Sequence, residues 1–173
     1  MIAEKEKEKD AVILLYQSIS ILSCRFTVFL PMHIDYFMNY FSQVDSGTQI
    51  VFLENMIYIA GKYVYSFQKS HLLKLLQFIN SESLIKARAR AAQLACILFS
   101  DKKISKAIFA IDNSNYDDPV MSEMYDYVFH KLEPTLQNNI LWSKNFIILL
   151  EKFVDINVSN IEKGPQILDL GIE

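Results

Sequence analysis

Basic side chains gather in one part of this sequence, where they could bind the phosphates of a nucleic acid. From Lys62 to Lys106 the chain holds nine basic and two acidic residues, although its net charge is −3 at pH 7. Such a segment attracts phosphate backbones or an acidic protein partner, and phosphate contacts depend on salt but hardly on base sequence. The candidate phosphate-binding residues are Lys74, Lys86, Arg90, Lys102, Lys103 and Lys106. The alternative is that acidic residues of the flanking segments neutralise this charge within the protein.

The run KARAR, residues 86–90, contains two kinds of basic residue. At 100° per residue, a helix over this run turns Lys86 and Arg90 to one side, where they could face a ligand, whereas Arg88 falls close to the apolar side. An inward-facing arginine must be paired or hydrogen-bonded, because an unpaired buried charge is unfavourable. We therefore expect a structural role for Arg88, with Glu82 or a carboxylate of an adjacent repeat as its partner.

The sequence contains no pattern typical of catalysis or metal binding. His33, His71 and His130 are far apart and belong to no HExxH, CxxC or HxE pattern. The loop DNSNYDD, residues 112–118, alternates oxygen ligands but lacks the glycine and the glutamate that a calcium loop requires at fixed positions. Neither a glycine-rich phosphate loop nor a nucleophile elbow occurs. We expect a protein that is not an enzyme and that uses no cofactor, metal or small-molecule substrate.

The strongest helical pattern lies between Ser70 and Asp101. Large apolar residues recur at helical spacing from His71 to Ile79. The polar run from Asn80 to Ser83 then favours a turn, so a second helix should begin near Leu84. Small residues of this second helix would let a neighbouring helix approach closely, and they are Ala87, Ala91, Ala92 and Ala95. The segment predicts a helical hairpin, a unit that buries its apolar faces by stacking on others.

The rest of the chain divides into further helices. Pro31 can open a helix because its missing N–H has no acceptor in the first turn. With four glycines and four prolines in 173 residues, long helices are favoured over turn-rich sheets. The expected helices cover the charged lead to Cys24 and residues 31–43, 48–67, 102–111, 119–132 and 141–154. We predict an all-α fold with one helical domain over residues 1–157 and an irregular tail over residues 158–173.

The apolar run from Ala11 to Leu30 has about the length of a membrane span. It contains Gln17 and Arg25, and a charge within a span is unfavourable by roughly 2.5–3.5 kcal/mol, so we expect a buried helix and no membrane contact. Cys24 and Cys96 lie in apolar helical patterns, where free cysteine usually behaves as a small hydrophobic residue. No signal peptide is apparent in the charged lead, and the sequence favours a reducing, intracellular compartment.

The segment ARARAAQLACIL, residues 87–98, resembles the second helix of a HEAT repeat, with Ala87 and Arg88 at the family's V-R pair. More narrowly, the pattern R-x-R-x-x-Q-L, formed by Arg88, Arg90, Gln93 and Leu94, resembles an early repeat of the G-type HEAT subunit of condensin. The resemblance implies antiparallel helical hairpins stacked as a short right-handed array. It also implies a kleisin-type protein partner and duplex DNA bound along a basic surface.

The sequence therefore favours a non-enzymatic helical scaffold that binds a protein partner and duplex DNA in chromosome organisation. The location would be nuclear or chromosomal for a condensin-like protein and cytoplasmic otherwise. The alternative is a compact helical adaptor or pathogen factor that binds only a protein partner.

Overall fold

The computed structural model describes residues 2–99, 118–127, 130, 144–149 and 151 of the chain. This part is 90% helical and contains no strand. The predicted all-α class is thus confirmed for the residues that the structure describes.

The described elements follow one another as helices joined by short 3₁₀ turns. Their bounds are α1 Ile2–Arg25, η1 Thr27–Phe29, α2 Leu30–Tyr40, η2 Phe41–Gln43, α3 Ser46–Tyr63, η3 Val64–Ser66, α4 Lys69–Asn80, α5 Ile85–Leu98 and α7 Pro119–Asp126. Residues 144–149 and 151 are also helical.

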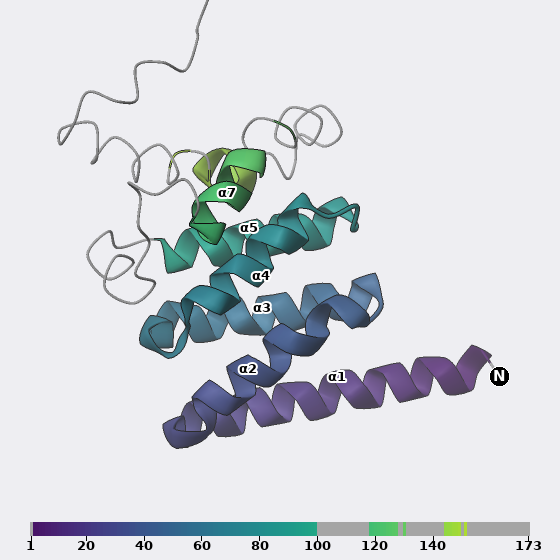
Figure 1. Cartoon of the computed structure of the whole chain (residues 1–173). Coiled ribbons are helices and arrows are strands. Elements are labelled where there is room, and N and C mark those ends of the chain that lie inside the picture. Colours follow the sequence, from purple (N-terminus) through teal and green to yellow (C-terminus); the bar gives the residue numbers. More distant parts are fainter. Residues whose placement is uncertain (1, 100–117, 128–129, 131–143, 150, 152–173) are drawn as a thin grey trace, which may run out of the picture.

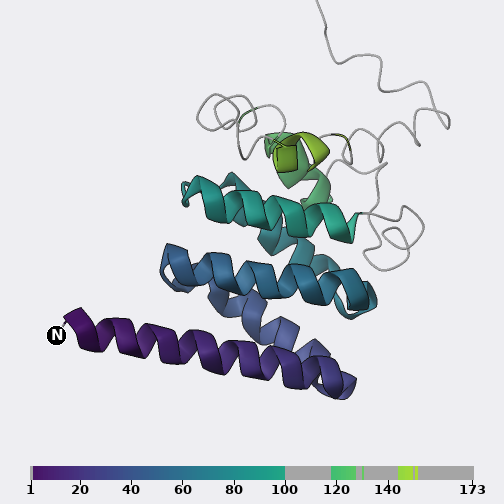
Figure 2. The ribbon, with the colours of Figure 1, turned by 180° about the vertical axis from the view of Figure 1, so that it is seen from behind.

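The helices form two layers that are seen from opposite sides in Figures 1 and 2. One layer holds α1, α3 and α5 side by side, with α3 packed between the other two. The second layer holds α2, α4 and α7, of which α4 packs against both α5 and α7. In Figure 1 the chain runs in one direction along α1, α3 and α5 and returns along α2 and α4. The described helices therefore form two antiparallel layers that pack on each other.

Local chemistry sets several of the helix starts. Pro31 lies in the first turn of α2, as expected from its missing N–H. Asp45 caps α3, because its side chain accepts hydrogen bonds from the backbone N–H groups of Gly47 and Thr48. The same carboxylate binds the Lys9 ammonium of α1 at 2.7 Å. This one side chain thus begins α3 and joins it to α1.

The predicted hairpin corresponds to α4 and α5, which pack on each other across the turn from Ser81 to Leu84. Helix α5 also packs against α3. Its alanines are fully buried, and they are Ala87, Ala89, Ala91, Ala92 and Ala95. Because these side chains are small, two neighbouring helices can contact α5 at the same time.

The core lies between the two layers and is rich in aromatic rings near α2. Tyr16 of α1 stacks on Phe52 of α3, with ring centroids 3.9 Å apart, and Phe37 of α2 lies against both. Further along the stack, Leu53 and Leu94 are fully buried. The side chains of Cys24 and Cys96 are half-buried at its margin.

The expectation of a buried helix over Ala11–Leu30 is wrong for most of its side chains. Tyr16, Ser20 and Ser23 of α1 are buried, but the large aliphatic residues on its other sides are exposed. The reason is position: α1 lies at one end of the stack, so α2 and α3 cover only part of its circumference.

The later predictions are tested only in part. Pro119 opens α7 as predicted, and Asp118 caps it by accepting a hydrogen bond from the Val120 N–H. Phe146 and Leu149 of the expected last helix are buried. The expected helix over residues 102–111 and the tail over residues 158–173 lie outside the described residues.

Candidate functional site

Arg90 was expected to face a ligand, but the structure shows it paired within the protein. Its Nη2 lies 3.1 Å from Glu54 Oε1 of α3, and its Nη1 donates to Gln93 Oε1 at 2.9 Å. The guanidinium is half-buried between α5 and α3. This pair is an example of the internal neutralisation that the charge pattern left open.

The other predicted basic residues do not form one described surface. Lys74 of α4 donates to Asn39 of α2, so it contacts the layer opposite to the one that Arg90 contacts. Lys86 is exposed and makes no ion pair within the described part of the chain. Lys102, Lys103 and Lys106 lie outside the described residues.

Arg88 has the inward position that its place in the sequence indicated. Its Nε donates to the backbone carbonyl of Ile79, near the end of α4, at 2.6 Å. Burial lowers the pKa of the guanidinium, and the negative charge of Glu82 opposes that shift. Glu82 thus acts on Arg88 electrostatically, and Arg88 ties the end of α4 to α5.

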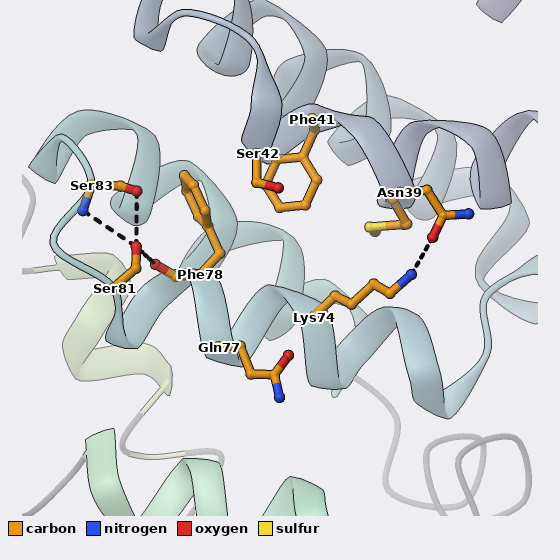
Figure 3. A pocket seen from close by; sticks show the side chains of 9 residues that line it. Asn39, Phe41, Ser42, Lys74, Gln77, Phe78, Ser81 and Ser83 are labelled. Atoms are coloured by element: carbon orange, nitrogen blue, oxygen red, sulfur yellow. Dashed lines mark hydrogen bonds between the residues drawn. The ribbon is translucent and has the colours of Figure 1, made fainter.

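A groove between α2 and α4 brings together residues that the sequence keeps far apart (Figure 3). Its volume is about 340 Å³. It is lined by Met38, Asn39, Phe41, Ser42, Lys74, Gln77, Phe78, Ser81 and Ser83. We call it the α2–α4 groove.

The floor of the α2–α4 groove is apolar. The rings of Phe41 and Phe78 meet edge to face, with centroids 4.9 Å apart, and both side chains are buried. A small apolar group that enters the groove would therefore leave water for an aromatic surface.

Polar groups surround this floor. At one end, Ser81 Oγ donates to the Phe78 carbonyl at 2.6 Å and lies 2.8 Å from Ser83 Oγ. At the other end is the Lys74 ammonium with its Asn39 partner, and Gln77 lies between the two ends. The arrangement can hold an apolar group and hydrogen-bond the polar atoms beside it, with one positive charge available for an anion.

A buried histidine joins the two helices that form the groove. His71 Nδ1 of α4 accepts the Gln68 backbone N–H at 3.1 Å, which leaves the proton on Nε2. Nε2 then donates to Asp35 Oδ1 of α2 at 2.6 Å. Burial lowers the pKa of His71, and the bond to Asp35 opposes this effect.

Sequence reasoning found Lys74 but missed the groove around it. Residues 38–42 are separated by more than thirty positions from residues 74–83, and neither segment has a recognisable motif. Only the packing of α2 beside α4 brings them together. No short-range signal in the sequence could have indicated the site.

The described part of the chain contains neither a metal-binding cluster nor a single helix suited to span a membrane. No three His, Cys, Asp or Glu side chains there lie close enough to hold a metal ion. No single described helix passes the length and hydropathy test for a membrane span, and only the bent pair of Lys7–Arg25 and Thr27–Gln43 passes it jointly.

Comparison of the whole chain with protein-family models, with curated proteins and with solved structures found no match.

Proposed function

We propose that this chain is a non-enzymatic helical scaffold that holds a segment of a protein partner in the α2–α4 groove. The observation that carries the proposal is the groove itself, in which a buried aromatic floor is surrounded by hydroxyl, amide and ammonium groups. Peptide segments present the same combination of apolar side chains and polar backbone atoms.

The groove also indicates the chemistry of the partner segment. Its volume of about 340 Å³ suits one or two apolar side chains. Among the described residues of its lining only Lys74 is basic, so a carboxylate next to the apolar side chain would replace Asn39 as its partner. We therefore expect a short segment in which a Leu, Met or Phe is followed or preceded by Asp or Glu.

The experiment is selection of a random peptide library, displayed on phage, against the full chain. A selected peptide, labelled with a fluorophore, is then titrated with the protein and followed by anisotropy. We expect Lys74→Glu and Gln77→Trp to weaken binding at least about tenfold, the first by repelling the carboxylate and the second by filling the groove.

The matched control is Lys62→Glu, which makes the same charge change at an exposed position on α3 outside the groove. It should leave peptide affinity unchanged, and circular dichroism should show that all three variants are folded. A library that yields no binding peptide, or peptides that bind the groove variants as well as wild type, would refute the proposal.

Duplex DNA is a second candidate ligand, favoured by the exposed charge of Lys86, which has no ion-pair partner among the described residues. In that case the condensin resemblance suggests a kleisin-type protein for the groove and a chromosomal location. Without DNA binding, the chain would be an intracellular adaptor for a protein partner alone.

Anisotropy of labelled duplex DNA across a salt series tests this second candidate. Binding that weakens steeply with salt, and that is lost in Lys86→Glu/Arg90→Glu, would support it. Because Arg90 already pairs with Glu54, we expect Lys86→Glu alone to give most of the loss. No binding at low salt would eliminate DNA as a ligand.

A further inference from the structure

Helix α1 carries an exposed apolar stripe with the spacing of a coiled coil. The stripe consists of Val12, Leu15, Ile19 and Leu22 of α1 and of Phe26, the residue directly after the helix, and successive residues are alternately three and four positions apart. The exposed fraction of these five side chains ranges from 41% to 63%. We call these residues the α1 stripe.

A different side of α1, which faces α2 and α3, makes the contacts with the core, so the stripe cannot also do so. That side packs Tyr16 against Phe52 and Phe37. It also buries Ser20, whose hydroxyl donates to the Tyr16 carbonyl at 2.9 Å and lies 3.0 Å from His33 Nε2 of α2. These bonds fix the rotation of α1 about its axis. The large aliphatic side chains must then remain on the open side.

The stripe continues into an apolar groove between α1 and α2. This second groove, about 520 Å³ in volume, is lined by Tyr16, Ile19, Leu22, Ser23, Phe26, Phe29, Met32, His33 and Tyr36. Phe29, Met32 and Tyr36 are each more than half exposed. The stripe and these three side chains form one apolar surface at the α1 end of the stack.

We infer that this surface binds a second copy of the chain, with the two α1 helices packed side by side. The stripe residues together with Phe29, Met32 and Tyr36 are each about half exposed. At on the order of 150–200 Å² per large side chain, they expose roughly 700–800 Å² of surface that a partner could cover. A standard protein interface buries about 800 Å² per partner. A two-fold pairing of the same patch therefore supplies the area of a stable dimer without any other component.

Charge complementarity favours the antiparallel order of the two helices. In that order Val12 lies opposite Leu22 and Leu15 opposite Ile19, so the stripe pairs with itself along its length. Glu8, one step before the stripe, then lies level with Phe26 of the other copy and beside its Arg25. Both charged residues are exposed. A parallel order would instead place the two Glu8 carboxylates side by side.

The test is sedimentation velocity of the full chain at concentrations from about 1 to 100 μM. We expect the wild type to sediment as a dimer, with twice the 20.1 kDa mass of one chain. Leu15→Gln/Leu22→Gln should raise the dissociation constant at least about 100-fold and give a monomer. Both positions are exposed, so the double variant should keep the helical circular dichroism of the wild type.

The matched control is Leu14→Gln/Ile21→Gln, which makes the same polar changes on a different side of the same helix. Leu14 and Ile21 are 64% and 70% exposed, which is more than any of the stripe residues. This control should remain a dimer. If it dissociates as readily as the stripe variant, the stripe is not the interface.

Other occupants of the surface would be recognised by different outcomes. A wild type that is monomeric throughout the concentration range overturns the inference. A monomer that floats with vesicles of phosphatidylcholine and phosphatidylserine, and loses this on Leu15→Gln/Leu22→Gln, would assign the surface to a membrane instead. The orientation is tested in a Cys24→Ser/Cys96→Ser background. A disulfide between Val12→Cys in one copy and Leu22→Cys in the other supports the antiparallel order, and one between two Val12→Cys copies overturns it.

Discussion

Helices α1 and α5 lie in the same layer, on either side of α3, but they place their apolar residues differently (Figure 2). Helix α5 packs against α3 and α4, and its alanines, Leu94 and Leu98 are fully buried. Helix α1 is ten residues longer than α5, yet it buries only Tyr16, Ser20 and Ser23 among its described side chains. The two helices show that apolar content does not determine burial. Helix α5 has small side chains, so α3 and α4 can pack closely on it. One side of α1 has no neighbour among the described residues, so its large side chains stay exposed.

The largest effect is expected when a buried side chain of α5 is shortened. Leu94→Ala removes a fully buried side chain and leaves a cavity among packed helices. We expect the free energy of unfolding to fall by about 2–5 kcal/mol, measured by urea denaturation followed by circular dichroism. A loss well below that range would mean that α5 is less tightly packed than the structure shows.

Enlarging α5 tests whether its small residues set the helix spacing. Ala91→Leu adds a large side chain at a position with no exposed surface. We expect a destabilisation of about 1–3 kcal/mol, because α3 and α4 must move or the new side chain must adopt a strained rotamer. The same measurement on Lys86→Leu, at an exposed position of α5, should show almost no change. Equal effects at the two positions would contradict the role of the alanines.

The contact that joins α1 to α3 gives a smaller effect. Asp45→Ala removes the cap of α3 and the partner of Lys9, which should destabilise the protein by about 1 kcal/mol. Although partial burial opposes it, hydrogen bonds from Lys9 and Thr48 lower the pKa of Asp45 to about 2. The cap is therefore retained down to strongly acidic pH. Asp45→Asn, which can still cap the helix, should lose less stability than the alanine variant; the reverse order would disprove capping.

The joint between α1 and α2 should be sensitive to pH. Burial lowers the pKa of His33 from its usual 6.5, and burial also lowers that of His71. As pH falls through about 6.5, the unfolded chain binds protons that the folded protein does not, so stability is present above this pH and is lost below it. The melting temperature should decrease as the pH is lowered from about 7.5 to about 5. His33→Gln should show a smaller decrease, and an unchanged pH dependence would exclude His33 as a source.

The smallest effect is expected on the open side of α1. Leu14→Ala truncates a side chain that is 64% exposed and lies outside the α1 stripe. The free energy of unfolding should change by less than about 0.5 kcal/mol, against the much larger loss for Leu94→Ala under the same conditions. A loss comparable to that of Leu94→Ala would mean that α1 is covered in solution on this side too.

The sequence predicted the starts of α2 and α7 and the end of α4 to within one residue, because these depend on local chemistry. Pro31 and Pro119 lack a backbone N–H, and both lie in the first turn of a helix. The polar run after Ile79 contains Ser81, whose hydroxyl bonds the Phe78 carbonyl at the end of α4. Such signals act over three or four residues, so they can be read from the sequence directly.

Features that depend on packing could not be predicted in the same way. The pattern around Arg88 indicated an inward side chain, but the Ile79 carbonyl that accepts its proton is set by how α4 meets α5. Helical periodicity groups Arg90 with Lys86 on one side of the helix, but it gives no sign of Glu54, the partner of Arg90 on another helix. An apolar stripe such as Val12–Phe26 shows that a face is apolar, but it does not show what covers that face.

His71 has a consequence for the way a partner would bind. Both of its ring nitrogens are engaged, one with Gln68 of its own segment and the other with Asp35 across the gap to α2. His71 therefore links α2 to α4 and sets the width of the α2–α4 groove before any ligand arrives. A rigid site loses little conformational entropy on binding, so its partners should be selected by size and shape.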